Sequence, residues 1–266
     1  MSVVPVDVGA ARAAVGQVAK RVAELLDSIT DTSVPVPGLE WTAGETGAHL
    51  VTVTNWFVDY VTGRKKPPVV TSEIPAFNAD RIANFPERDG PRLGDHLTEA
   101  VEDFLSTTGE YRGEDPVPWY DDHTIDVADI ICILLGELVV HGLDIARAVD
   151  RPWPIEPDHA RLILTGMLSV LPLYLDRDQA RDVRASYQIR VKSNPPVYLF
   201  FDDGALTVTP TQVEAVDCRI TADPVDYLLL GFGRIGQLRP ILRGNLISWG
   251  RKPWLGTKLA NLVQKP

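Results

Sequence analysis

The stretch Ile130-Ile-Cys-Ile-Leu-Leu-Gly-Glu137-Leu-Val-Val-His141-Gly-Leu-Asp-Ile-Ala-Arg147 places a glutamate and a histidine inside a long apolar run. Residues four apart lie on one face of a helix, so Glu137 and His141 point toward the same region. A carboxylate and an imidazole in apolar surroundings cost free energy unless they are paired or bound to a ligand. We therefore consider both as ligands of a divalent metal such as zinc, with a solvent-facing ion pair as the alternative.

A catalytic zinc site usually takes three protein ligands, and His49 is the best candidate for the third. His49 lies in a second apolar run, on a helix that begins with the capping-box pattern Thr42-Ala-Gly-Glu45. The alternative for His49 is a core histidine whose hydrogen bonds are satisfied within the protein. The other histidines lie in more polar stretches and are weaker candidates: His96, His123 and His159.

Composition excludes several classes of protein. The chain has 266 residues and a net charge of −10, which argues against a nucleic-acid partner because such proteins present a basic surface. Apolar runs are interrupted by charged residues and no signal-peptide pattern is visible, so we expect no membrane span and a cytoplasmic location. Cys132 and Cys218 have no paired spacing and are expected to be buried free thiols.

The period of the apolar residues changes near residue 180. Before this point the spacing is helical, and helices are expected over residues 6–29, 42–63, 76–84, 93–107, 124–150 and 158–174. After it the pattern alternates, and strands are expected over residues 187–191, 197–201, 205–209 and 216–221, followed by short helices. The sequence predicts an all-α domain over residues 1–178 and a smaller α+β domain over residues 179–266.

Two motifs resemble those of a known enzyme family. The segment Trp41-Thr-Ala-Gly-Glu-Thr-Gly-Ala-His49 is followed far downstream by Glu137-Leu-Val-Val-His141-Gly-Leu-Asp144. This pair is similar to the motifs of the mycothiol-dependent maleylpyruvate isomerase family, within the DinB/YfiT-like metal-binding proteins. The resemblance spans residues 6–175 and implies a DinB-like four-helix bundle with extra helices. Residues 185–263 resemble the sterol-carrier-like (SCP2-like) α+β domain often appended to these enzymes, chiefly at residues 242–250.

The resemblance implies a metal and a thiol cosubstrate. In the family, the positions that match His49, Glu137 and His141 bind a divalent metal, typically zinc, although this ligand set also suits iron or nickel. The low-molecular-weight thiol mycothiol is the cosubstrate, and its metal-held thiolate attacks an electrophilic small molecule. The isomerase eliminates the thiol again, whereas relatives transfer it onto the electrophile. The resemblance thus implies an isomerase or an S-transferase, and we expect a monomer or a dimer.

Further candidates follow from the needs of such chemistry. Asp144 follows His141 by three residues and is a candidate to accept a hydrogen bond from its free ring nitrogen, with a surface carboxylate as the alternative. An anionic substrate requires a cation, and arginine binds carboxylates through two parallel hydrogen bonds. The candidates are Arg81 in the helical domain and Arg239, Arg243 and Arg251 in the C-terminal domain. We predict catalytic roles for Asp144, Arg81 and Arg243, the last because it lies in the segment most similar to the family.

A non-enzymatic function is the alternative. The C-terminal domain would then carry a small apolar molecule or lipid, and the metal of the helical bundle would be structural. The apolar segment 227–232 suits the wall of a ligand tunnel and equally an ordinary core. Bound lipid in the purified protein would favour the carrier, whereas metal-dependent consumption of thiol would favour the enzyme.

Overall fold

The computed structural model describes residues 2–67 and 70–264. The chain forms two compact units: the first is Val6–Ile155, and the second is the chain from Glu156 onward together with Ser2–Pro5. The division precedes the boundary expected between residues 178 and 179. The reason is that α6 (Pro157–Gly166) contacts α8 (Pro224–Gly231), and its Leu164 packs against the core of the second unit. The helix expected at residues 158–174 therefore belongs with the sheet.

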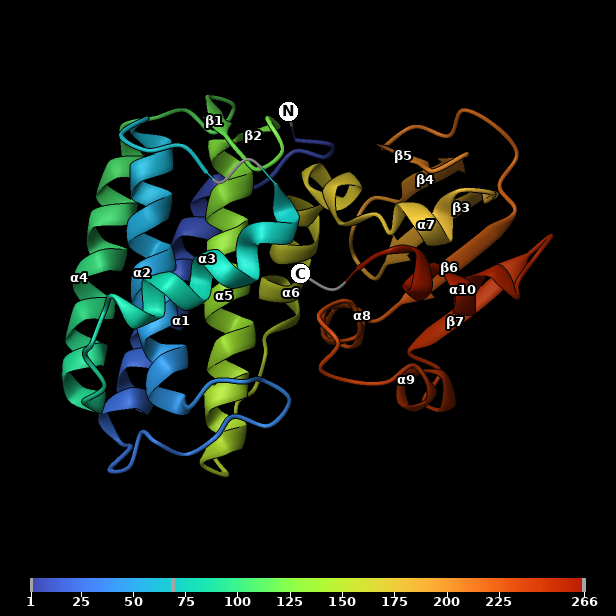
Figure 1. The fold of residues 1–266 in the computed structure, drawn as a ribbon. Helices are drawn as coiled ribbons and strands as arrows, with labels where there is room; N and C mark the ends of the chain where they lie inside the picture. Colours follow the sequence, from blue (N-terminus) through green and yellow to red (C-terminus); the bar gives the residue numbers. More distant parts are fainter. Residues whose placement is uncertain (1, 68–69, 265–266) are drawn as a thin grey trace. The chain divides into compact units, whose positions relative to one another are not determined.

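The first unit is a four-helix bundle. Its long helices are α1 (Val8–Asp27), α2 (Ala43–Val61), α4 (Gly90–Gly109) and α5 (Val127–Ala148), which run side by side in Figure 1. Both α1 and α2 contact both α4 and α5, so the bundle closes around one core. A one-turn helix η1 (Thr71–Glu73) leads into the shorter α3 (Ile74–Ala83), which packs against α2. All five expected helices of this unit are confirmed to within a few residues.

Local capping fixes where the two site-bearing helices begin. The Thr42 N–H donates to the Glu45 carboxylate at 2.8 Å, and the Glu45 N–H donates to the Thr42 hydroxyl at 3.2 Å, which confirms the capping box of α2. At α5, the Asp126 N–H donates to the Asp129 carboxylate at 3.4 Å. These contacts satisfy N–H groups that have no intrahelical partner, so the start of each helix is fixed.

Two features of the first unit were not expected from the sequence. A hairpin of β1 (Pro116–Pro118) and β2 (Thr124–Asp126) precedes α5, although proline is uncommon within strands. After α5, the Trp153 indole N–H donates to the Val139 carbonyl at 3.1 Å. Its ring lies where a side chain at Gly142 would project, so the position after His141 accepts only glycine.

The second unit is built on a five-stranded sheet with the order β5-β4-β3-β6-β7. The strands are β3 (Arg184–Val191), β4 (Val197–Asp202), β5 (Ala205–Thr209), β6 (Cys218–Ala222) and β7 (Leu246–Gly250). Only β3 and β6 pair in parallel, and the other neighbours are antiparallel. The four expected strands are confirmed. The edge strand β7 was not predicted from the sequence, whereas the short helix α9 (Leu238–Leu242) before it agrees with the short helices expected after the strands.

Helices of the second unit pack on the sheet. They include α7 (Arg177–Ala180), α8 and α10 (Leu255–Leu262), and Figure 1 shows α8 and α10 beside the strands. The Asp223 carboxylate accepts the N–H groups of Val225 and Asp226, so the expected cap of α8 is confirmed. The helix expected at residues 158–174 ends at Gly166, and the chain continues through the short turns η2 (Met167–Ser169) and η3 (Leu171–Tyr174).

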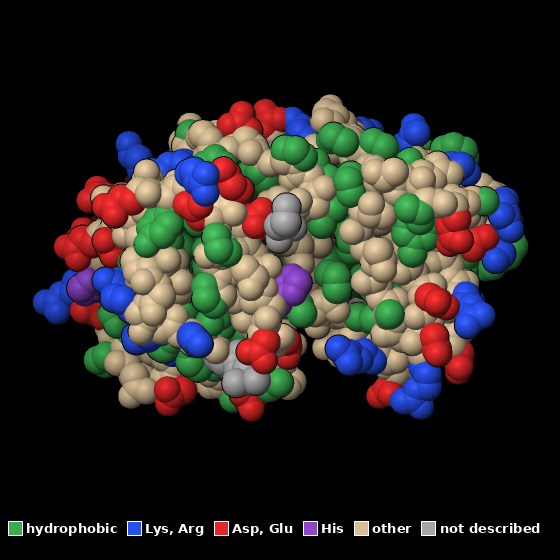
Figure 2. Space-filling view, turned by 90° about the horizontal axis from the view of Figure 1, so that it is seen from above, with side chains coloured by type: hydrophobic (Ala, Val, Ile, Leu, Met, Phe, Trp, Pro, Cys, Tyr) green, Lys and Arg blue, Asp and Glu red, His purple; other side chains and the backbone are tan. Residues whose placement is uncertain are grey.

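The surface carries charges of both signs. Figure 2 shows acidic and basic side chains interspersed over the face that it presents, without one continuous basic area. Cys132 and Cys218 are both buried and unpaired, as expected. No helix within residues 2–67 and 70–264 has the length and apolar character that crossing a membrane requires.

Candidate metal centre

Three side chains from two helices of the first unit converge as expected. His49 comes from the second turn of α2, and Glu137 and His141 come from adjacent turns of α5. The Glu137 Oε2 atom lies 3.1 Å from His49 Nε2 and 3.4 Å from His141 Nε2. His49 is buried, whereas the Glu137 side chain retains 25% of its exposure, so the cluster is open to small molecules on one side. His49 is thus buried and hydrogen-bonded to Glu137, and the assignment of the three side chains as metal ligands stays a prediction.

The spacing of these atoms fits a single metal ion. One ligand atom from each of His49, Glu137 and His141 lies within 4.8 Å of the other two. Two ligand atoms at about 2.1 Å from a zinc ion and at a tetrahedral angle are about 3.4 Å apart. One carboxylate oxygen and two imidazole nitrogens are also the donor types that catalytic zinc sites use, with a fourth position left for substrate. The donor set and its spacing therefore suit a divalent metal.

The surroundings of the cluster set its protonation. Burial would raise the pKa of Glu137, but hydrogen bonds from His141 and His49 lower it well below its ordinary value. Burial would lower the pKa of His141, but its hydrogen bonds to Asp144 and Glu137 raise it to about 9. Burial dominates for His49 and lowers its pKa. The carboxylate is thus ionised and His49 is neutral near pH 7, as ligands of a metal must be.

Asp144 and Trp41 hold the two imidazoles in place. The His141 Nδ1 atom lies 3.1 Å from Asp144 Oδ2, and Asp144 is buried, so the surface-carboxylate alternative does not hold. This contact leaves Nε2 of His141 directed toward Glu137, the arrangement by which carboxylates orient metal-binding histidines. The ring centroid of Trp41 lies 4.9 Å from that of His49 and 6.0 Å from that of His141, so Trp41 packs against both imidazoles.

Comparison with known protein families identifies this bundle. The family model described as the mycothiol maleylpyruvate isomerase N-terminal domain matches residues 11–146, which contain the whole cluster. The chain belongs to this family. No relative among the curated proteins matches the sequence.

Solved structures show that the likeness to a maleylpyruvate isomerase extends beyond the bundle. The crystal structure of the mycothiol-dependent maleylpyruvate isomerase is 11% identical, with a TM-score of 0.55, and the match covers 92% of this chain and 93% of that chain. A variant of it, with one histidine replaced by alanine, is 12% identical with a TM-score of 0.56 over the same shares. At this identity the match shows the fold, including an α+β unit after the bundle, and confirms the predicted fold class.

Arg81 is the one candidate arginine that the first unit contributes. It lies on α3, is only 6% exposed, and donates from its guanidinium to the Thr52 carbonyl. The positive charge of Arg81 also contributes to lowering the pKa of His49. Burial lowers the pKa of Arg81 itself to about 10, so it stays charged near pH 7. No carboxylate among the described residues forms an ion pair with it, and its buried Nε–H has no hydrogen-bond partner there.

An aromatic cluster that the sequence reasoning did not identify surrounds Arg81. The guanidinium carbon lies 4.8 Å from the ring centroid of Trp56 and 5.0 Å from that of Phe77. The ring of Tyr60 then contacts those of Trp56, Trp119 and Tyr120. Cation–π contacts stabilise a buried guanidinium without consuming its hydrogen-bond donors. In the sequence, the adjacent aromatic residues Trp119 and Tyr120 before α5 are the feature that indicates this cluster.

The other candidates lie elsewhere in the fold. Arg243 is exposed at the end of α9, in the second unit, and its catalytic role stays a prediction. Arg239 and Arg251 are also exposed residues of that unit. His96 is exposed on α4, and His123 and His159 are partly buried outside the cluster of possible ligands.

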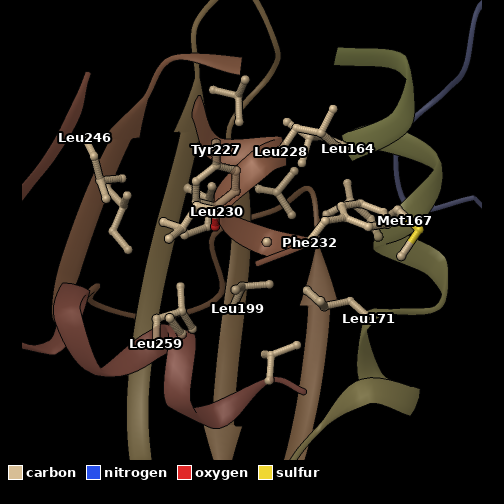
Figure 3. A pocket seen from close by; sticks show the side chains of 18 of the residues that line it. Leu164, Met167, Leu171, Leu199, Tyr227, Leu228, Leu230, Phe232, Leu246 and Leu259 are labelled. Carbon is tan, nitrogen blue, oxygen red and sulfur yellow. The ribbon is translucent and has the colours of Figure 1, made fainter. Parts of the chain in front are cut away.

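The second unit of this family member contains an apolar cavity of about 370 Å³. Figure 3 shows side chains from α6 and η2, from α8, and from the sheet directed into a common space. Leu164, Met167, Leu230 and Phe232 line it, and Leu199 belongs to the sheet side. No Asp, Glu, Lys, Arg or His lines the cavity among the residues that the structure describes. Burial raises the pKa of the lining Tyr227 to about 12, so the cavity is neutral near pH 7.

Proposed function

We propose that this protein is a metal- and mycothiol-dependent enzyme, either a maleylpyruvate isomerase-like enzyme or a thiol S-transferase. The observation that carries the proposal is the convergence of His49, Glu137 and His141 within 4.8 Å, in the bundle of a chain that belongs to this family. We propose zinc as the ion because three ligands of these types, with room for a fourth, match its catalytic sites. A cytoplasmic location accords with a reduced thiol substrate and with two unpaired cysteines.

The residues around the cluster have separable roles in this proposal. A bound divalent metal would supply a positive charge that lowers the pKa of the mycothiol thiol, so that the thiolate is present at neutral pH. Asp144 holds the His141 ring in one orientation and keeps the proton on Nδ1. Trp41 covers both imidazoles and excludes water from that side. Glu137 is the most exposed of the three ligands, so we place the thiol and the electrophile on its side.

Arg81 indicates the charge of the substrate. A buried cation without a carboxylate partner is costly, and an anionic ligand would offset this cost. The Nε–H of Arg81 has no hydrogen-bond partner among the described residues, so it can donate a hydrogen bond to a substrate carboxylate. We therefore propose an electrophile that carries a carboxylate, which is bound by Arg81 within the first unit. Arg243 stays a second candidate for this role.

The two reactions share their first step. The thiolate sulfur adds to a carbon–carbon double bond conjugated to a carbonyl group, and the electron pair moves to the carbonyl oxygen. In isomerisation the former double bond rotates as a single bond, the electron pair returns, and the thiolate leaves with the trans isomer formed. In S-transfer a proton adds to the adjacent carbon instead, and the thioether is the product. Arg81 would hold the substrate carboxylate fixed in both.

One assay tests this function directly. The purified protein is incubated with mycothiol and either maleylpyruvate or a panel of generic electrophiles, before and after treatment with a chelator. We expect metal-dependent isomerisation of maleylpyruvate or metal-dependent loss of free thiol. The same activity in His141→Ala protein, or no activity with any electrophile in protein that contains one metal per chain, would exclude the proposal.

The cavity of the second unit favours a second candidate function, the carriage of a small neutral apolar molecule. Its volume of about 370 Å³ lies within the range of ligand sites, and its lining contains no charged side chain among the described residues. Organic extraction of the purified protein followed by mass spectrometry tests this candidate. A bound apolar compound that is absent from Leu230→Trp protein would support it. An extract without any apolar compound, from a protein that also binds no apolar probe, would exclude it.

A further inference from the structure

Exposed apolar side chains gather in one short part of the second unit. Six of the eight large hydrophobic residues that are exposed in the described chain lie between residues 238 and 254. They are Leu238, Ile241, Leu242, Ile247, Trp249 and Trp254. Leu238 and Leu242 are 76% and 85% exposed, and such neighbouring exposed leucines are uncommon on monomeric soluble domains. We call these six residues, with Arg239, Arg243, Arg251 and Lys258, the basic apolar surface.

The local structure places these side chains on shared faces. Leu238, Ile241 and Leu242 stand at helical spacing on α9, so they form one apolar stripe directed to solvent. Ile247 and Trp249 are two residues apart on β7 and share a face of this edge strand. Because α9 contacts β7, the two groups are neighbours. On the opposite face of β7, Leu246 lines the apolar cavity.

The charge of this segment is opposite to that of the chain. Residues 227–266 contain seven Lys and Arg and no Asp or Glu, in a protein with a net charge of −10. Arg239 and Arg243 follow α9 leucines directly, and Lys258 is exposed nearby in sequence. Arg251 is also exposed and forms an ion pair with Asp217 at 3.6 Å. Basic residues interleaved with Leu, Ile and Trp are typical of segments that lie in the interface of a membrane with anionic lipids.

We propose that the basic apolar surface docks the second unit on an anionic lipid surface. Tryptophan and leucine would enter the headgroup region, where tryptophan is favoured, and the arginines and lysines would remain at the phosphates. A symmetric contact with a second copy is disfavoured, because it would oppose basic residues with basic residues. The cavity behind β7 gives such docking a use, since apolar compounds are concentrated in lipid rather than in water.

Vesicle co-sedimentation of the full chain tests this proposal. Vesicles of phosphatidylcholine are compared with vesicles in which about a third of the lipid is phosphatidylglycerol, at about 0.1 M salt. We expect at least tenfold stronger binding to the anionic vesicles, and its loss at high salt. Vesicles should also shift the tryptophan emission to shorter wavelength, and the shift should diminish in Trp254→Phe protein.

Two pairs of variants separate the apolar and the charged contributions. The double variant Leu238→Ser with Leu242→Ser should lose at least tenfold in binding, because both side chains would enter the lipid. The double variant Arg239→Gln with Lys258→Gln should lose about fivefold for each charge. The matched controls are Val213→Ser, since Val213 is 70% exposed elsewhere in the unit, and Lys20→Gln, since Lys20 is 79% exposed on α1. Both controls should bind as the parent does.

Three results would overturn the proposal. The first is equal binding, or no binding, to the two vesicle types. The second is unchanged vesicle binding by the leucine variant, with thermal unfolding showing that it is folded. The third is self-association of the parent that the leucine variant loses while no vesicle binds, which would assign the surface to a second copy of the chain.

Discussion

The two units treat buried polarity in opposite ways. The bundle gathers two histidines, two carboxylates and an arginine near one another, all wholly or largely withdrawn from water. The cavity of the second unit is lined without any charged side chain among the described residues. Buried charge is costly, so its retention in the bundle indicates a use for it. Burying apolar side chains carries no such cost, so the apolar lining by itself does not indicate that the cavity binds a ligand.

The largest expected effect concerns the three ligands in the bundle. His49→Ala, Glu137→Gln and His141→Ala should each lower the metal affinity by at least about a hundredfold, because each removes one of three proposed protein ligands. Elemental analysis measures the metal, and circular dichroism should show unchanged helix content. His96→Ala on α4 is the matched control and should retain the metal. Full metal in any of the three variants would remove that residue from the site.

The next effect concerns the residue behind the site. Asp144→Asn should weaken metal binding by about 10- to 100-fold, because the amide no longer holds the His141 ring as the carboxylate does. Competition with a coloured chelator measures the affinity. Asp103→Asn on α4 is the control, since Asp103 is exposed on the surface of the same bundle. An unchanged affinity would make Asp144 a purely structural residue.

The metal affinity of the bundle should fall as the pH falls. In the metal-free protein the pKa of His141 is raised to about 9, so this ring is protonated at pH 7 and must lose its proton when it binds a metal. The ionised Glu137 and the neutral His49 lose none. The apparent affinity should therefore fall about tenfold for each pH unit below 9, with one proton released per metal. Calorimetry in buffers of different ionisation enthalpy counts the protons, and a count of zero would contradict the assignment.

The smallest effect on the metal should come from the second unit. Leu230→Trp reduces the volume of the cavity, so it should lower the binding of a neutral fluorescent probe severalfold. The same variant should leave metal affinity unchanged, since the cluster lies wholly in the first unit. A parallel change in both measurements would show that the two units are coupled. Val213→Trp, outside the cavity lining, is the control.

The sequence predicted the bundle better than the second unit because its signals are local. Capping at Thr42 and the spacing of Glu137 and His141 depend on residues within one or two helical turns. His49 was selected from its apolar surroundings and supported by the resemblance, because no local rule relates residues on different helices. Strand β7 was missed since an exposed edge strand lacks the alternation that indicates strands. The aromatic residues around Arg81 and the cavity itself arise only from packing between distant segments.

The distribution of the proposed metal ligands over two helices has a mechanical consequence. Glu137 and His141 move together because one helical hydrogen-bond ladder joins them, whereas His49 belongs to α2. An ion bound by all three would therefore cross-link α2 and α5. Binding to the folded form alone raises stability in proportion to the logarithm of the free metal concentration. The unfolding temperature of the bundle should thus rise with the free metal concentration.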